Sequence, residues 1–291
     1  MPELAEVHYF SRRWDEGRRH LVREVDLHPR SRIFRGCDTD ALQERLTGGR
    51  LEAMLTHGKQ MLAQFSGNCW LGLHLGMTGD MRVEPADFSP GKHDHLVLRQ
   101  ARRCLVFSDP RMFGRIRFDI SGDGPPPWWR GLPPDLFDRR FTVAHLETLL
   151  KRRSRAPLKA ALLDQDLFPG VGNWMADEIL WRLHLTPLTP CGSLDADAAK
   201  RLHREVRWVA RRAMAIIGKD WSEPPASWLY PHRWEKGGRC PRCRTELLRQ
   251  EMAGRTTCWC PQCQPSGETK GREVGSGRRR ERPAHSDPRA G

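Results

Sequence analysis

Apolar and polar residues follow three different patterns along the chain. Within residues 4–18, Val7, Phe10 and Trp14 stand three and four positions apart, which predicts one apolar face on a short helix. From Leu21 onward, apolar and polar residues alternate in short runs separated by Gly and Pro, which predicts antiparallel sheets arranged as a β-sandwich. The runs are Leu21–Leu27, Leu51–Leu55, Met61–Phe65, Trp70–Leu75, His95–Leu98, Cys104–Phe107 and Arg115–Ile120.

The helical period returns after the proline-rich stretch Gly122–Pro134, which has the composition of a linker. Steps of three and four predict helices around Leu146–Leu150, around Met175–Leu183, and over a longer stripe formed by Leu202, Val206, Val209, Ala213 and Ile217. We therefore expect a multidomain α+β protein, with an N-terminal sandwich domain at residues 1–134 and a helical domain at 135–235.

Four cysteines near the C-terminus form two Cys-x-x-Cys pairs, Cys240 with Cys243 and Cys260 with Cys263. Two such pairs direct four thiolates at one tetrahedral ion, so residues 236–265 are predicted to form a zinc finger with one structural Zn²⁺. The other cysteines are scattered, which favours a reducing compartment. Residues 266–291 are rich in Gly, Ser, Pro and Arg, and we expect a disordered basic tail.

The charge balance favours a polyanionic partner. The chain has 49 Lys and Arg against 36 Asp and Glu, a formal net charge of +13, and it carries 11 Trp. Positive charge together with aromatic residues favours nucleic acid over an anionic lipid surface or a merely basic exterior. No apolar run has the length of a membrane span and no signal-peptide pattern opens the chain. We expect a cytoplasmic protein without membrane contact, nucleoid-associated if bacterial.

The start Met1-Pro2-Glu3 offers a specific chemistry. Initiator methionine is normally removed before proline, which would leave Pro2 with a free secondary amine beside a carboxylate. An α-amino group has a pKa of about 8, well below that of lysine, so much more of it is unprotonated at neutral pH. Such an amine can attack a sugar C1′ and form an iminium, with Glu3 or Glu6 handling protons. By itself, however, Met-Pro-Glu is also an ordinary way to begin a helix.

A set of motifs in a fixed order favours the interpretation of Pro2 as a nucleophile. These motifs are Pro2-Glu3-Leu4, Lys59, His74–Met77, Asp109–Gly114, Gly170–Asn173 and the four cysteines. Over residues 2–264 the chain closely resembles the formamidopyrimidine-DNA glycosylase and endonuclease VIII family of base-excision repair enzymes. The resemblance implies a β-sandwich, a helix-two-turn-helix domain and a zinc finger. It also implies removal of oxidised or ring-opened purines, such as 8-oxoguanine and formamidopyrimidine, from damaged double-stranded DNA, with associated AP lyase cleavage.

The resemblance also implies roles for single residues. Pro2 would attack C1′ and Glu3 would move protons, while Lys59 and Arg255 would meet phosphates beside the lesion. A flipped nucleotide leaves a gap in the duplex, which the apolar, cationic and aromatic side chains of Met77, Arg111 and Phe113 would fill.

Three further DNA-binding residues follow from the same comparison. Glu6 would lie close to the reaction, Lys159 would contact a phosphate, and Asn173 would cap its helix and hold the DNA backbone. The glycines before Asn173 permit a tight turn, and the amides at the start of that helix are suited to a phosphate.

Three features depart from the family pattern or compete with it. Ala5 replaces a common proline, which we expect to loosen the first helix, and the segment 218–228 is short where guanine-specific members carry a longer loop. His93-Asp94-His95 has the composition of a second metal motif, but we expect these residues to be structural. Three alternative functions stay open: a noncatalytic zinc-containing damaged-DNA-binding protein, a glycosylase preferring oxidised pyrimidines, and an RNA- or ribosome-associated protein. We expect a monomer.

Overall fold

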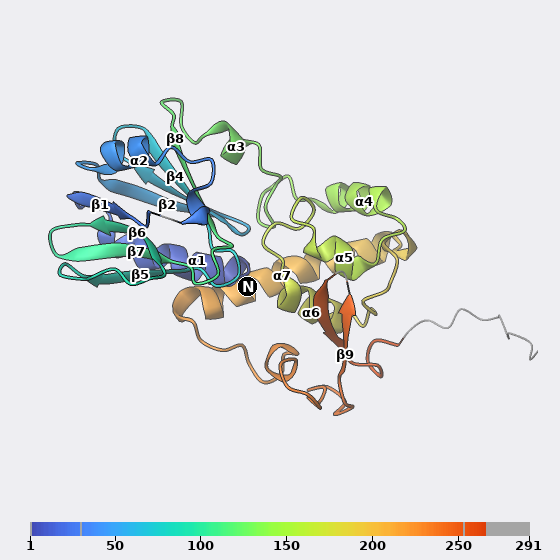
Figure 1. Ribbon diagram of the computed structural model, residues 1–291. Coiled ribbons are helices and arrows are strands. Elements are labelled where there is room, and N and C mark those ends of the chain that lie inside the picture. The colour runs from blue at the N-terminus through green and yellow to red at the C-terminus, as the bar shows by residue number, and fades with distance from the viewer. Residues whose placement is uncertain (1, 30, 253, 266–291) are drawn as a thin grey trace, which may run out of the picture.

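A computed structural model describes residues 2–29, 31–252 and 254–265, and the predicted basic tail at 266–291 lies outside this range (Figure 1). Two four-stranded antiparallel sheets form the N-terminal domain, with strand orders β1-β6-β7-β5 and β2-β3-β4-β8. The predicted sandwich is confirmed. Its strands are β1 (Glu24–Leu27), β2 (Leu51–His57), β3 (Gln60–Phe65), β4 (Cys69–His74), β5 (Asp80–Pro85), β6 (Asp94–Arg99), β7 (Arg103–Ser108) and β8 (Arg115–Ile120).

Period-two alternation explains how each strand divides its side chains between the two faces of its sheet. In β4, Cys69, Leu71 and Leu73 point into the core between the sheets, whereas Gly72 lies on the outer face. There the segment after β8 covers the sheet, because a Cβ on Gly72 would lie 2.7 Å from the Trp128 ring. The predicted linker 122–134 therefore contains a short helix, α3 (Pro127–Arg130), that packs on the sandwich.

The helical domain contains α4 (Val143–Arg152), α5 (Leu158–Leu163), α6 (Asn173–Arg182) and α7 (Ala196–Asp220), with short 3-10 turns η3 (Cys191–Ser193) and η4 (Tyr230–His232). The predicted stripe on α7 is fully buried. Asp195 caps this helix by accepting a hydrogen bond of 2.7 Å from Ala198 N. None of the helices among the described residues combines the length and the apolar character that crossing a membrane requires.

The first helix, α1 (Leu4–Arg13), belongs to both domains. Leu4 and Ala5 are part of the core of the helical domain, whereas Val7 is part of the sandwich core. Figure 1 accordingly shows the N-terminus between the two domains, where α1 meets α7. The expectation that Ala5 loosens this helix was wrong: Ala5 is fully buried, and the amide of Leu4 donates to Gly170 O at 3.0 Å.

Several elements differ from the sequence prediction. The helix predicted to reach residue 18 ends at Arg13 and continues as a 3-10 turn, η1 (Trp14–Gly17), and the first strand begins at Glu24 rather than Leu21. The short helices α3 and α5 had not been predicted from the apolar pattern. A further three strands and one helix had also not been predicted, because their apolar positions are few or their runs are strongly polar. These are β5, α2 (Thr39–Leu46), and the hairpin strands β9 (Leu248–Met252) and β10 (Arg255–Trp259); a further 3-10 turn, η2 (Arg32–Phe34), precedes α2.

Candidate active site

The carboxylate of Glu3 is bound to the first turn of α6, which comes from the other domain. One oxygen accepts from Trp174 N at 2.9 Å, and the other accepts from Gly172 N at 3.0 Å and Met175 N at 3.1 Å. Free amides and the positive end of a helix dipole favour an anion at this place. Three of the amides that we expected to suit a phosphate therefore hold Glu3, and the amide of Asn173 is not among them.

Two buried carboxyl groups share this region. Glu3 is 2% exposed and Glu6 is 8% exposed; Glu6 accepts from Trp174 Nε1 at 2.8 Å and from Glu3 N at 3.2 Å. Burial raises the pKa of Glu3, while the charge of Lys59 and the amides of Trp174 and Met175 oppose the rise. Burial, together with the charge of Glu3, raises the pKa of Glu6 to about 7. Near neutral pH the pair therefore includes a carboxyl group that can hold or release a proton.

Lys59 lies in the turn between β2 and β3, which fits closely against the loop before α6. The preceding Gly58 has a φ of +56°, and a Cβ on it would lie 2.8 Å from Gly170 N. Only glycine satisfies both the backbone angle and this close approach. Burial lowers the pKa of Lys59, whereas Glu3 favours its charged form. The turn thus brings a cation of the sandwich to the site formed at α6.

A cavity of about 360 Å³ brings together five of the predicted site residues, which come from all three parts of the chain. Glu3, Lys59 and Met77 come from the sandwich side, Asn173 comes from α6, and Arg255 comes from the hairpin of the predicted zinc finger. The lining also contains Gly172 of the predicted glycine turn and residues that the sequence prediction missed, namely Leu163, Trp174, Arg233, Trp234, Arg249, Gly254 and Thr256. No pattern marked Arg233 and Trp234, which stand outside every motif.

Lys159 is a structural residue in this fold, contrary to the predicted phosphate contact. It is 1% exposed, and its Nζ donates to Asp177 Oδ1 at 2.5 Å and to Asn173 O at 2.8 Å. Asp177 Oδ2 accepts from Arg233 Nη2 at 2.6 Å and from Cys258 N at 3.1 Å. This buried network joins α5, α6 and the C-terminal hairpin and fixes the walls of the cavity.

Asn173 also differs from its predicted role as helix cap. Gly172 is the N-cap of α6 and Asn173 is the first helical residue. Its Nδ2 donates to Thr256 O at 2.7 Å, so the side chain holds the C-terminal hairpin beside the cavity. Its Oδ1 is buried and has no hydrogen-bond partner among the described residues.

Met77, Arg111 and Phe113 lie on two loops that pack backbone to backbone. A Cβ on Gly76 would lie 2.5 Å from Gly114 N, so the loops can approach this closely only with glycine there. The fully buried Asp109 holds them together: its carboxylate accepts from Thr78 Oγ1 at 2.7 Å and from Gly114 N at 2.6 Å.

Phe113 is 47% exposed, and the guanidinium carbon of Arg111 lies 4.6 Å from its ring centroid. This places an aromatic and a cation together at the surface. Neither residue lines the cavity that contains Glu3; Phe113 instead lines a neighbouring hollow beside Arg115 and Arg117.

The residues 93–95 have structural partners, as we expected. Asp94 accepts hydrogen bonds from Arg82, Ser108 and Gly91 N, and His95 Nε2 lies 2.9 Å from Asp109 O. These contacts tie strand β6 to its neighbours and to the loop of Phe113.

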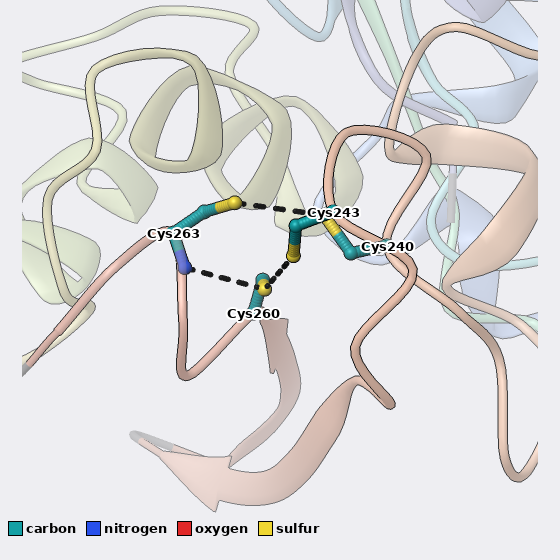
Figure 2. Close-up of side chains that lie close together, drawn as sticks. All are labelled: Cys240, Cys243, Cys260 and Cys263. Atoms are coloured by element: carbon teal, nitrogen blue, oxygen red, sulfur yellow. Dashed lines mark hydrogen bonds between the residues drawn. The ribbon is translucent and has the colours of Figure 1, made fainter.

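The four predicted zinc ligands converge (Figure 2). Their sulfur atoms all lie within 4.8 Å of one another, with 3.4 Å between Cys243 and Cys260 and 3.8 Å between Cys240 and Cys263. Zn–S bonds of about 2.3 Å in a tetrahedron place sulfur atoms about 3.8 Å apart, so the site fits one Zn²⁺ with four thiolates. Trp181 Nε1 donates to Cys240 Sγ at 3.3 Å and anchors the finger on α6.

Comparisons with known proteins give the same family for each of the three parts of the chain. Residues 1–116 match the formamidopyrimidine-DNA glycosylase N-terminal domain, 132–223 match the H2TH domain of the same glycosylase, and 237–265 match a zinc finger found in FPG and IleRS. A formamidopyrimidine-DNA glycosylase of Thermus thermophilus is 36% identical over 283 residues, which cover 92% of this chain and all of that protein. The one of Roseiflexus is 36% identical over 228 residues, or 75% and 83% of the two chains.

Solved structures show the same architecture. A structure of wild-type Lactococcus lactis Fpg in complex with DNA containing an oxidized pyrimidine superposes with a TM-score of 0.81 at 27% identity, covering 91% of this chain and all of that one. A structure of MutM with DNA containing carbocyclic 8-oxo-G has a TM-score of 0.79 at 26% identity and the same coverage.

Proposed function

The chain belongs to the formamidopyrimidine-DNA glycosylase family, and from this premise we propose that it excises oxidised or ring-opened purines from damaged double-stranded DNA. The strand is then cleaved at the abasic site, which makes the protein both a glycosylase and an AP lyase. One observation carries the proposal: the carboxylate of Glu3, directly after Pro2, is fixed by α6 inside a cavity that Lys59 and Arg255 also line.

Pro2 is the proposed nucleophile once Met1 has been removed. Its nitrogen forms a bond to C1′ of deoxyribose while the bond from C1′ to the damaged base breaks and the base leaves with a proton. Opening of the sugar ring gives an iminium, which makes the C2′ proton acidic. Loss of that proton expels the 3′ phosphate, and water then releases the sugar fragment from Pro2.

Glu3 and Glu6 serve proton transfer in this scheme. Glu3 stands next to the nucleophile, and its raised pKa lets it protonate the opening sugar ring. Glu6 does not line the cavity and accepts a hydrogen bond from the amide of Glu3, so its effect on proton transfer is exerted through Glu3. The cations Lys59 and Arg255 face the same cavity and are suited to the phosphates on either side of the flipped nucleotide.

Met77, Arg111 and Phe113 are proposed to occupy the space that the flipped nucleotide leaves. The exposed ring of Phe113 can separate neighbouring bases, and the donors of Arg111 can meet the unpaired base. The hydrogen bonds of Asp109 keep this surface in place before DNA binds, so less ordering is needed on binding.

The proposed domain limits are 1–134, 135–235 and 236–265. Leu136 already belongs to the core of the helical domain, which supports a boundary just before it. We also propose a monomer, because segments of one chain complete the cavity.

Borohydride trapping tests the nucleophile. The protein is incubated with duplexes carrying 8-oxoguanine, ring-opened guanine, an oxidised pyrimidine or an abasic site, and reduction should freeze an adduct that peptide mass spectrometry assigns to Pro2. Pro2→Gly or an added N-terminal residue should abolish trapping and strand cleavage on every duplex. Normal cleavage by the extended protein would contradict the proposal, and tight binding without any cleavage by the wild type would support a noncatalytic DNA-binding protein.

A further inference from the structure

Trp234 combines two properties that no motif or predicted role explains. Its side chain is 53% exposed although tryptophan is usually well buried, and it lines the cavity that contains Glu3 and Lys59. An exposed indole next to reactive groups offers a flat apolar surface to whatever enters the cavity.

The position of this indole is fixed before any ligand binds. The neighbouring Arg233 is 3% exposed and forms a buried ion pair with Asp177, with Nη2 2.6 Å from Oδ2. The backbone is held from the other side, because Arg249 Nη1 donates to Trp234 O at 3.0 Å. Tyr230 packs edge-on against the indole, with ring centroids 5.6 Å apart.

Arg233 lies over the indole of Trp234, and half of this residue is still exposed. The guanidinium carbon of Arg233 lies 4.3 Å from the ring centroid of Trp234, as in a cation–π contact. Since half of Trp234 is still exposed, the face opposite Arg233 is the candidate surface for a ligand. A series of ring contacts, Trp234–Tyr230–Trp174, connects Trp234 to the indole of Trp174, whose Nε1 donates to Glu6.

The segment 218–228 does not contribute to the cavity wall that Trp234 lines. None of its residues, all of which the structure describes, lines the cavity. Trp221 packs instead against α1, with ring centroids 4.9 Å from Tyr9 and 5.1 Å from Phe10. The aromatic residues that line the cavity are therefore Trp174, which is 3% exposed, and Trp234, which is half exposed.

We propose that the face of Trp234 opposite Arg233 is a stacking platform for the extrahelical damaged base. Bases of every kind present a π-face, and stacking on an aromatic side chain repays part of the cost of leaving the duplex. The platform rests on the proposed glycosylase function, because it holds the base that the enzyme removes. Trp234 acts by binding and orienting the base and has no part in bond breaking.

Two substrates separate a base platform from a residue that merely supports the fold or the DNA backbone. Base excision from an 8-oxoguanine duplex requires the base to be bound, whereas cleavage of a preformed abasic site involves no base. Trp234→Ala should slow single-turnover excision between about fivefold and 150-fold, the range that one base–aromatic stack contributes. Cleavage and borohydride trapping on the abasic duplex should change less than twofold in the same preparation.

Two further variants control for side effects. Trp234→Phe keeps an aromatic ring and should restore most of the excision rate. Trp208→Ala removes another indole with an arginine on its ring, at 3.7 Å, from α7 outside the cavity, and it should leave the ratio of the two rates unchanged. Equal losses on both duplexes, or full excision by Trp234→Ala, would overturn the platform. Absence of both activities in the wild type would instead overturn the proposed function.

Discussion

At the scale of single residues, the site depends on two buried carboxyl groups, Glu3 and Glu6, whose burial disfavours the charged form while hydrogen-bond donors favour it. Glu3 has three amide donors and Lys59 to stabilise its negative charge. Glu6 has one indole and one amide, and it lies beside the charge of Glu3. Burial penalises the charge of both and raises the pKa of each; for Glu6, which has fewer donors and lies beside the charge of Glu3, the pKa is raised to about 7.

The raised pKa of Glu6 makes stability depend on pH. In the folded state Glu6 holds its proton up to its raised pKa of about 7, whereas in the unfolded chain it releases the proton near the ordinary glutamate pKa of 4.5. Between these values the folded state binds more protons, so the free energy of unfolding falls as pH rises through the window, by up to about 3 kcal/mol. Glu6→Gln should remove this fall because it has no proton to lose and keeps an acceptor for Trp174.

Urea unfolding at pH 5.5 and pH 8 measures the effect, with Glu44→Gln, at an exposed position on α2, as control. The wild type and the control should lose stability between the two values, and Glu6→Gln should lose less. The same loss in all three proteins would show that Glu6 does not carry this titration.

At the scale of elements, the first turn of α6 connects Glu3 to the helical domain. Gly172 is required there for space rather than for backbone freedom, since its φ of −124° suits any residue. A Cβ at this position would lie 2.2 Å from Glu3 Cδ, which is far inside contact distance. The missing side chain of one domain thus makes room for the carboxylate of the other.

Gly172→Ala should therefore displace the Glu3 carboxylate from the α6 amides and slow excision and abasic-site cleavage by about 100-fold or more, the scale of a lost proton-transfer group. Gly122→Ala is the matched control, because the nearest atom to its Cβ, Asn68 Nδ2, is 3.7 Å away. Rates are measured under single-turnover conditions, with circular dichroism to verify folding. A Gly172→Ala protein as active as the control would show that this arrangement of Glu3 is dispensable.

At the scale of the whole molecule, the zinc finger completes the cavity from the far end of the chain. It contributes Arg249, Arg255 and Thr256 to the lining, and its contacts with α6 pass through Trp181 and Asn173. A small finger has little apolar core, and zinc binding of about 10–16 kcal/mol supplies the folding energy in such modules. The metal therefore stabilises one wall of the site.

Removal of zinc by chelation, or Cys260→Ser, should release the hairpin β9–β10 from its contacts with α6 while both larger domains stay folded. Affinity for an abasic-site duplex should fall, and the slope of log K against log salt should become shallower by about 0.9 for each phosphate contact that is lost. Zinc content, limited proteolysis and binding at several salt concentrations measure this. Cys37→Ser is the control, since Cys37 lies outside the cluster, and an unchanged salt slope in the metal-free protein would contradict the role given to the finger.

The sequence by itself determined what depends on local periodicity and local spacing. Alternation predicted the sandwich, the three-four period predicted α7, and the cysteine pairs predicted the zinc site, because each pattern repeats within one element or one short module. The ordered motifs also marked Glu3, Lys59, Met77, Asn173 and Arg255, which the fold brings to one cavity.

Only the tertiary structure decided which partner each polar group finds. Lys159 and the α6 amides looked suited to phosphate, yet Asp177 binds the lysine and Glu3 binds the amides. Trp234 belongs to no motif, and its place in the cavity wall depends on tertiary contacts, among them the ion pair of the neighbouring Arg233 and the hydrogen bond from Arg249. A buried charge is stable only with a partner, and that partner lies on another segment of the chain, where no local pattern can indicate it.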